Sequence, residues 1–239
     1  MFNRQLYKQT AKKQLASRKT VPVLATLITM AFLVILGSGS EIQSTAVSNA
    51  PYENGTVWDM QAVLFCFSST ATELLFSFLT LVITGILTLA ECSLYDRYFN
   101  TLEKISFSEY LQGFSRWLTG ALAALWFSLW VFLWSLLFFI PGIVKAFSYS
   151  QMFFILAENP KIGVAKAMRI SKVLTKGYKA DLFVMSLSFF GWNLLSIFTL
   201  GILQLWIQPY EYMSFTNAYK SLKMHALRSG TLSESDFQA

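Results

Sequence analysis

Residues 117–157 read WLTGALAALWFSLWVFLWSLLFFIPGIVKAFSYSQMFFILA, and this stretch decides the fold class. A membrane-spanning helix needs roughly 20 consecutive apolar residues, so the stretch is too long for one span and long enough for two. Pro141 and Gly142 interrupt it, because proline removes a helix hydrogen bond and glycine permits a turn. We therefore predict two spans, over residues 117–140 and 142–157.

The rest of the chain contains apolar blocks of similar length. Residues 21–37 and 62–90 each fit one span, and residues 182–219 fit two spans that divide near residues 199–201. Only 13% of the 239 residues are charged and the mean hydropathy is +0.48, whereas a soluble domain has about 25% charged residues. This composition excludes an ordinary soluble enzyme, a disordered chain and a nucleic-acid-binding domain. We predict an all-α fold, a polytopic transmembrane helical bundle of about six spans. A cleaved signal peptide is the alternative interpretation of the first span.

Basic residues indicate which side of the membrane is cytoplasmic. The segments 1–20, 91–116, 158–181 and 220–239 contain 6, 3, 6 and 3 of the 19 lysines and arginines, and the segment 38–61 contains none. Basic residues concentrate on the cytoplasmic side, so we predict two cytoplasmic termini, cytoplasmic loops at 91–116 and 158–181, and an outer loop at 38–61. A re-entrant late hairpin would leave this topology unchanged. The expected units are a basic segment (1–20), a membrane domain (21–219) and a tail (220–239).

Two cytoplasmic segments have the pattern of amphipathic helices. Residues 1–20 contain no acid, and their apolar residues at near-helical spacing are Phe2, Leu6, Tyr7, Ala11 and Leu15. In the segment 160–181, the basic residues that surround a less polar face are Lys166, Arg169, Lys172, Lys176 and Lys179. We expect both segments to lie on the membrane surface, and the second to hold anionic lipid at about 1 kcal/mol per basic residue. The alternatives are a solvated basic tail and a basic loop that only sets the topology.

Two acidic residues fall inside predicted spans. Glu73 and Glu211 each lie about eleven residues from the outer end of a span, which places them about 16 Å deep and near the midplane. A carboxylate at this depth costs roughly 2.5 to 3.5 kcal/mol and usually faces the interior of the protein. One interpretation is a polar midplane site, in which both acids line a cavity for a proton, a cation or a lipid head group. The other is that each acid is bonded to polar side chains of a neighbouring helix. Lys145 is expected near the outer end of its span, where its ammonium group can reach the outer membrane surface.

The sequence lacks the usual signatures of catalysis. It has one histidine, His225, in the basic tail, and no glycine-rich phosphate loop or suggestive nucleophile–base spacing. Cys66 and Cys92 are 26 residues apart on one predicted helix, which is about 39 Å and too far for a disulfide. We therefore predict no enzymatic activity, no catalytic residues, no cofactor and no metal site.

Three motifs carry a resemblance to a known family. They are Leu6-Tyr7-Lys8 before the first span, Ile140-Pro141-Gly142-Ile143 with Ala157-Glu158-Asn159-Pro160 after it, and AMRISKVLTKG at residues 167–177. Together with Gly191-Trp192 and Pro209-Tyr210, these motifs resemble the bacterial integral membrane family called domain of unknown function 975. The resemblance implies a six-helix protein of the bacterial cytoplasmic membrane with no established activity.

Two function classes are consistent with these features. The favoured class is a lipid-interacting or scaffolding protein of the bacterial cytoplasmic membrane, with anionic lipids, a second copy or another membrane protein as partners. The alternative is a small transporter that uses Glu73 and Glu211. A transporter should have a midplane cavity lined by both acids, whereas a scaffold should have a filled core with its charges at the rims.

Overall fold

The computed structural model describes residues 2–16, 18–48, 60–101, 103 and 105–238, and the side chains of residues 36–48, 60–70 and 139 fall outside that description. Helices are the only regular secondary structure of the described residues, which contain no strand. Its α-helices are α1 (Arg4–Leu15), α2 (Thr20–Ser48), α3 (Met60–Asn100), α4 (Phe107–Gln112), α5 (Trp117–Leu137), α6 (Phe139–Tyr149), α7 (Met152–Glu158), α8 (Val164–Leu174), α9 (Lys179–Phe198) and α10 (Gln204–Arg228). Two short 3-10 helices are η1 (Gly113–Arg116) and η2 (Glu234–Phe237).

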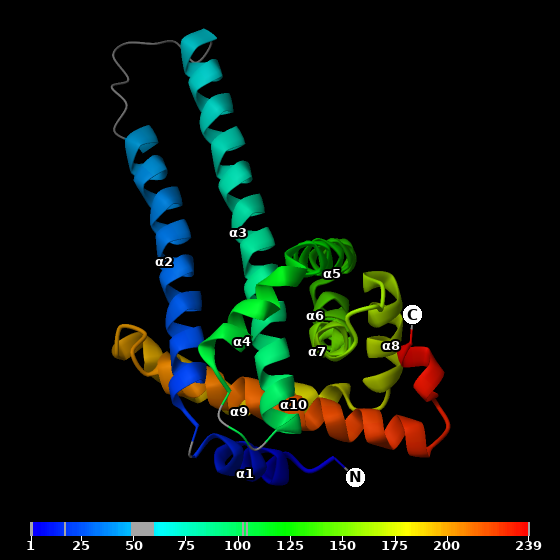
Figure 1. Ribbon diagram of the computed structural model, residues 1–239. Coiled ribbons are helices and arrows are strands. Elements are labelled where there is room, and N and C mark those ends of the chain that lie inside the picture. The colour runs from blue at the N-terminus through cyan, green and yellow to red at the C-terminus, as the bar shows by residue number, and fades with distance from the viewer. Residues whose placement is uncertain (1, 17, 49–59, 102, 104, 239) are drawn as a thin grey trace.

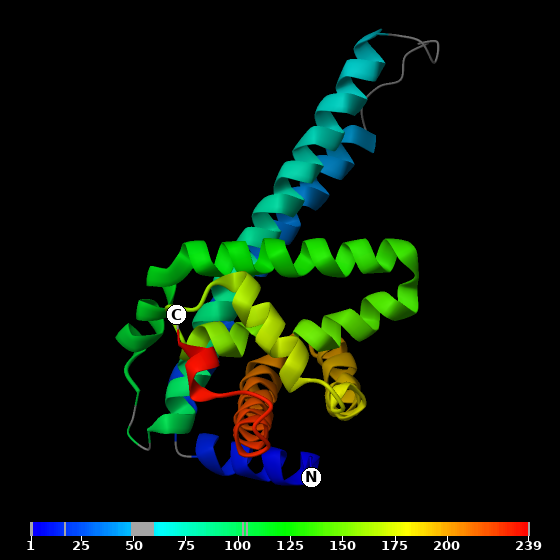
Figure 2. The same ribbon diagram turned by 90° about the vertical axis from the view of Figure 1, so that its right-hand side faces the viewer.

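The helices form three hairpins that diverge from a common base. The hairpin of α2 and α3 projects farthest from the rest of the protein (Figure 1). The hairpin of α5 and α6 runs across the view in Figure 2, with α6 returning beneath α5. Helix α10 crosses the lower end of α3, and α1 packs against α10 (Figure 1). The hairpins thus meet at one base and point in different directions, unlike the parallel helices of a simple bundle.

Several helices are long and apolar enough to cross a membrane. The described residues contain four such candidate spans, at residues 71–100, 107–137, 140–158 and 179–198. A fifth arises if α1 and the described part of α2, which bend by 103° relative to one another, are counted as a single span. This number indicates a multi-pass membrane protein.

The predicted sixth span, α10, is not among the candidate spans. Its 25 residues carry polar and charged side chains along the whole helix, among them Gln204, Gln208, Glu211, Asn217, Lys220 and Lys223. The sequence prediction placed a span at 201–219 because the aromatic and aliphatic residues between these positions dominate its first half. The described residues therefore contain four or five candidate spans, and the sixth span stays a prediction.

The projecting parts of the hairpins expose apolar side chains. In three of the four candidate spans, only 22% of the most apolar segment is buried inside the protein. Leu136, Leu137 and Phe198 near the hairpin tips are 74%, 65% and 81% exposed. An apolar surface of this extent is unfavourable in water and is suited to contact with lipid chains.

The core lies where the bases of the hairpins meet. Tyr95 and Tyr98 of α3, Ile155 of α7 and Tyr219 of α10 are all at most 2% exposed. The ring of Tyr95 stacks on that of Tyr212 of α10, with centroids 5.4 Å apart. Burial is thus concentrated at the base, where the polar connections and the hairpin ends pack together.

The hairpin of α5 and α6 turns at Phe138, and not at Pro141-Gly142 as the sequence predicted. Phe138 is extended (φ −159°, ψ 143°) and separates α5 from α6. Pro141 falls in the first turn of α6, where a missing N–H costs no helix hydrogen bond. Gly142 allows a close approach, because a Cβ atom there would lie 3.0 Å from Cα of Ser135. The two residues therefore start the second helix and pack it on the first.

The predicted division of the last hairpin near residues 199–201 is confirmed. Helix α9 ends at Phe198 and α10 begins at Gln204. Leu200 and Gly201 both have positive φ, 50° and 82°. Glycine adopts this conformation without steric cost, which explains why the turn falls at this position.

The connections contain more helix than the sequence predicted. In the expected outer loop 38–61, α2 continues to Ser48, and residues 49–59 lie outside the described residues. The expected cytoplasmic loop 91–116 begins inside α3, which continues to Asn100, and it also contains α4. Helix α3 extends past its apolar block because its polar residues find buried partners in other helices.

Helix α1 forms within the predicted basic amphipathic segment. Tyr7, Ala11 and Leu15 are buried, whereas Leu6 is 53% exposed. The buried residues contact the base of the hairpins, with Ala11 and Leu15 in the cluster that contains Met213 of α10. The apolar face of α1 therefore packs on protein, and its location on a membrane surface stays a prediction.

Candidate functional site

Helix α8 carries most of the basic residues predicted to contact anionic lipid. Its less polar face is buried and includes Ala167, Met168 and Ser171. The hydroxyl of Ser171 donates a hydrogen bond of 2.9 Å to the carbonyl oxygen of Ser148 at the end of α6. The apolar side of α8 is thus used for packing within the protein, and the exposed basic residues lie on its other sides.

The structure divides the five predicted basic residues among different environments. Arg169 and Lys172 line a pocket beside α5. The Nζ atom of Lys166 instead donates to a backbone carbonyl of the C-terminal segment. Lys176 is exposed in the turn after α8, and Lys179 begins α9. The predicted set therefore does not act as one continuous strip.

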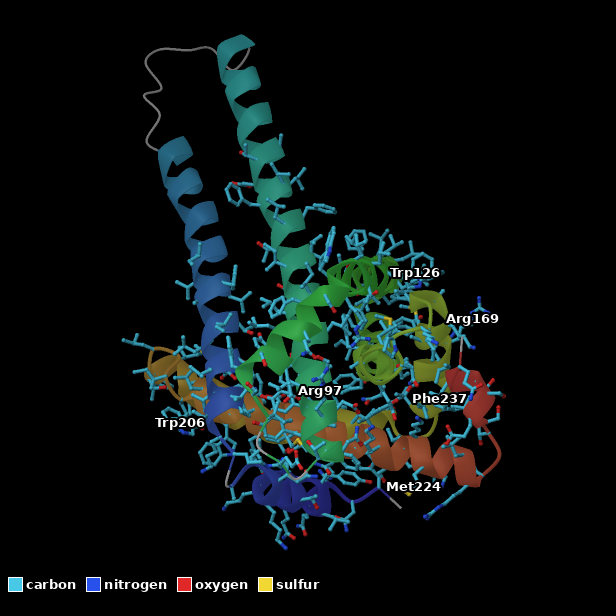
Figure 3. The ribbon with its side chains drawn as sticks, in the orientation of Figure 1. Arg97, Trp126, Arg169, Trp206, Met224 and Phe237 are labelled. Carbon is cyan, nitrogen blue, oxygen red and sulfur yellow. The ribbon has the colours of Figure 1, made fainter. Side chains whose placement is uncertain are left out.

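Arg169 and Lys172 meet aromatic side chains of α5 in a pocket of about 270 Å³, which we call the tryptophan pocket. Its lining residues are Trp126, Trp130, Trp134, Lys145, Tyr149, Ala165, Met168, Arg169 and Lys172. The three tryptophans follow one another at intervals of four residues, so they share one face of α5. Figure 3 shows Trp126 and Arg169 on the same side of the molecule, on α5 and α8. Three cations line this pocket, and none of its lining residues is acidic.

The polar groups of the tryptophan pocket are close to its rings. The Nζ atom of Lys145 lies 4.0 Å from the ring centroid of Trp134. Trp126 and Trp130 are arranged edge to face, with centroids 6.0 Å apart. Nε1 of Trp130 is buried and has no hydrogen-bond partner among the described residues. The pocket therefore places three cations beside tryptophan rings, which is an arrangement suited to an anion.

An apolar surface borders the tryptophan pocket. Leu122, Leu129 and Leu133 of α5 are each more than half exposed, and Trp126 is itself 38% exposed. These residues belong to a candidate membrane span. Tryptophan and basic side chains gather at the level of lipid head groups, next to the apolar part of a span.

The two predicted midplane acids are not brought together. Glu73 is exposed on the projecting part of α3, whereas Glu211 lies on α10. Helix α10 crosses α3 at Glu91, where Gln208 contacts it; that position is about 18 residues, or about 27 Å along the helix, from Glu73. A single cavity lined by both acids is therefore not formed.

Glu211 is paired with a residue of the neighbouring helix. Asn193 Nδ2 of α9 donates a hydrogen bond of 3.2 Å to Oε2 of Glu211. The arrangement corresponds to a polar link between α9 and α10.

Glu91 is a buried acid that the sequence did not single out. It is 1% exposed and lies where α2, α3 and α10 meet. Thr29 Oγ1 donates to its Oε1 at 2.7 Å, and Gln208 Nε2 lies 3.0 and 3.1 Å from its two carboxylate oxygens. Glu91 falls in the predicted loop 91–116 because the apolar block ends at Ala90. The apolar residues that recur after it, Leu94 and Tyr95 among them, are the signal that the helix continues inside the protein.

A charged cluster joins α3, α7 and α10 at the base. Lys220 Nζ lies 2.6 Å from Asp96 Oδ1 and 3.1 Å from Glu158 Oε1. Lys223 Nζ is 3.0 Å from the same Glu158 oxygen, and the Tyr219 hydroxyl donates to Oε2 at 2.5 Å. Two cations and two acids balance one another, so this cluster links helices.

The remaining residues with metal-binding or redox chemistry are the cysteines and His225. In the described part of the chain, no three His, Cys, Asp or Glu side chains converge as a metal site would require. Cys92 is a buried free thiol, and Cys66 falls outside the described side chains. His225 lies beside Tyr178, with ring centroids 5.7 Å apart.

One family matches part of the chain. The model of a family described as a protein of unknown function (DUF975) matches residues 139–226 and confirms the resemblance seen in the sequence. The matched region runs from α6 into α10 and contains six of the nine residues that line the tryptophan pocket, while the three tryptophans precede it. No curated protein and no solved structure matches the chain.

Proposed function

We propose that this protein is a lipid-interacting protein of the bacterial cytoplasmic membrane, and that the tryptophan pocket binds the phosphate of an anionic phospholipid. The observation that carries the proposal is the convergence of Lys145, Arg169 and Lys172 on tryptophan rings beside an exposed apolar helix face. The pocket of about 270 Å³ suits a head group, while the acyl chains would lie along the exposed leucines of α5.

Each polar group in the pocket has a role in this interaction. The planar guanidinium of Arg169 can donate two parallel hydrogen bonds to phosphate oxygens, and Lys145 and Lys172 add point charges. Basic pockets between membrane helices bind anionic head groups in this way. A bound lipid would also tie α5 to α8, which is consistent with a scaffolding role.

The transporter alternative has less support. It required a cavity lined by both Glu73 and Glu211, and these acids lie on separate parts of the structure. The bond from Asn193 to Glu211 already provides a structural reason for a buried acid on α10.

Native mass spectrometry of the full-length protein tests the proposal. The protein in detergent micelles is titrated with dioleoylphosphatidylglycerol, and bound lipids are counted. The double variant Arg169→Gln/Lys172→Gln should bind the lipid at its tightest site about 30-fold more weakly, because each basic residue near the surface contributes about 1 kcal/mol.

The matched control is Lys161→Gln/Lys176→Gln, which removes two exposed cations from the same segment outside the pocket. It should keep nearly the full affinity. Equal losses in the two double variants would indicate general attraction by a basic surface and would contradict a specific site.

A further inference from the structure

A second pocket opens where the chain bends between α1 and α2. Its volume is about 430 Å³, within the range of about 300 to 1,000 Å³ that is usual for ligand sites. We call it the bend pocket. Apolar residues from α9, α10 and the loop between them form its walls, including Phe189, Trp192, Leu203, Trp206, Ile207 and Pro209. Trp206 lies at the end of the α9/α10 hairpin in Figure 3.

The charged residues of the bend pocket are all basic. They are Lys12 from α1 and Lys19 from the connection before α2, and both side chains are exposed. No acidic residue lines the pocket. Since both lysines are exposed and the other walls are largely apolar, the pocket offers two cations beside an apolar lining.

Hydrogen bonds hold the bend in place. Arg18 is 8% exposed, and its Nη1 donates to the carbonyl oxygens of Thr101 and Glu103 at 2.7 and 3.0 Å. The hydroxyl of Tyr98 donates to the carbonyl oxygen of Arg18 at 3.2 Å. The position of α1 relative to α2 is thus set by contacts with the segment after α3. A preformed pocket loses little conformational entropy when a ligand enters it.

We propose that the bend pocket binds an amphiphile with an anionic head group and a long acyl chain. Lys12 and Lys19 contact the head group, and the chain lies among the tryptophans and aliphatic residues of α9 and α10. A phospholipid and a free fatty acid share this chemistry. The site is separate from the tryptophan pocket, with which it has no lining residue in common, and its occupancy does not depend on the function proposed above.

The test uses full-length protein carrying Arg169→Gln/Lys172→Gln, so that lipid binding at the tryptophan pocket does not obscure the result. Native mass spectrometry measures binding of dioleoylphosphatidylglycerol and of oleate, with dioleoylphosphatidylcholine as the zwitterionic probe. Adding Lys12→Gln/Lys19→Gln should weaken binding of both anionic probes about 30-fold and leave the zwitterionic probe nearly unchanged. Adding Val23→Trp, which fills the pocket, should abolish the tight binding of both anionic probes.

The control is Arg4→Gln/Lys13→Gln, which removes two exposed cations of α1 that do not line the pocket. Unchanged binding in Val23→Trp and in a second filling variant, Leu203→Trp, would overturn the proposal, as would an equal loss in the control. The unfolding temperature of each filling variant establishes that it is folded. Competition of oleate with the phospholipid would include free fatty acids among the ligands, and its failure would assign the site to phospholipid. In either case, lipid binding by the Val23→Trp variant tests the bend pocket alone, whatever the outcome for the tryptophan pocket.

Discussion

The carboxylate of Glu91 accepts hydrogen bonds from Thr29 and Gln208 at a position that is 1% exposed. Glu91→Ala leaves the hydroxyl of Thr29 and the amide of Gln208 without their acceptor. An unpartnered buried donor costs about 1 to 3 kcal/mol, so we expect a clear fall in thermal stability. The measurement is the unfolding temperature in detergent micelles.

Glu73 provides the control on the same helix. It is exposed, so Glu73→Ala should change the unfolding temperature little. A fall as large as that of Glu91→Ala would show that Glu73 has a structural role on the projecting part of α3. If neither variant changes the unfolding temperature, the hydrogen bonds of Glu91 with Thr29 and Gln208 do not stabilise the protein.

At the scale of single residues, the sequence showed which residues have suitable chemistry for a site, but not which residues surround them in the fold. It placed Arg169 and Lys172 in a lipid-binding group, and the structure places both in one pocket. The tryptophans of α5 carry a signal at intervals of four residues, but their meeting with α8 depends on how distant helices pack. Glu91 was missed for the same reason, since its partners come from α2 and α10.

At the scale of helices, α3 and α5 pack through glycines. A Cβ atom on Gly85 would lie 2.6 Å from the carbonyl oxygen of Gly120, and one on Gly120 would lie 2.9 Å from Cα of Ile86. Small residues allow membrane helices to approach in this way. We expect Gly120→Ala to destabilise the protein by about 1 to 3 kcal/mol, because backbone atoms must move apart. The unfolding temperature in micelles measures the effect.

Gly191→Ala in α9 is the matched control, because nothing lies within 4 Å of a Cβ atom at that position. Alanine is a better helix former than glycine by about 1 kcal/mol, so this variant should be neutral or more stable. Destabilisation by Gly191→Ala that equals the effect of Gly120→Ala would contradict the packing argument.

Apolar blocks predicted the helices well and their ends less well. The turn at 199–201 was predicted because the apolar block 182–219 is long enough for two spans, and the structure has Gly201 there at φ 82°. The turn at Phe138 was missed, because the Pro141-Gly142 pair is equally suited to the first turn of a helix. Hydropathy alone cannot distinguish these two uses of proline.

At the scale of the whole molecule, the charged and polar groups gather at the base and the apolar hairpins extend from it. The cluster of Lys220 with Asp96 and Glu158 lies at this base. The sequence correctly predicted an all-helical protein with several membrane-spanning helices. It could not predict the directions of the hairpins, because these depend on contacts between residues far apart in the chain.

The predicted membrane topology does not require that α10, which is not a candidate span, crosses the membrane. Because α9 and α10 form a hairpin, the chain leaves and returns on the same side whether the hairpin crosses the membrane or enters it partway. The exposed residues Lys161 and Ser235, on either side of that hairpin, should therefore share one face of the membrane. The positive-inside rule predicts that this face is cytoplasmic.

Cysteine labelling in intact cells tests this topology. In a chain with Cys66 and Cys92 replaced by alanine, Lys161→Cys and Ser235→Cys should resist a membrane-impermeant maleimide until the cells are opened. Labelling of both from outside would reverse the orientation and place the basic segments on the outer face. Labelling of only one would mean that α9 and α10 together cross the membrane once. This result would contradict the prediction that both ends of the hairpin lie on the same side of the membrane.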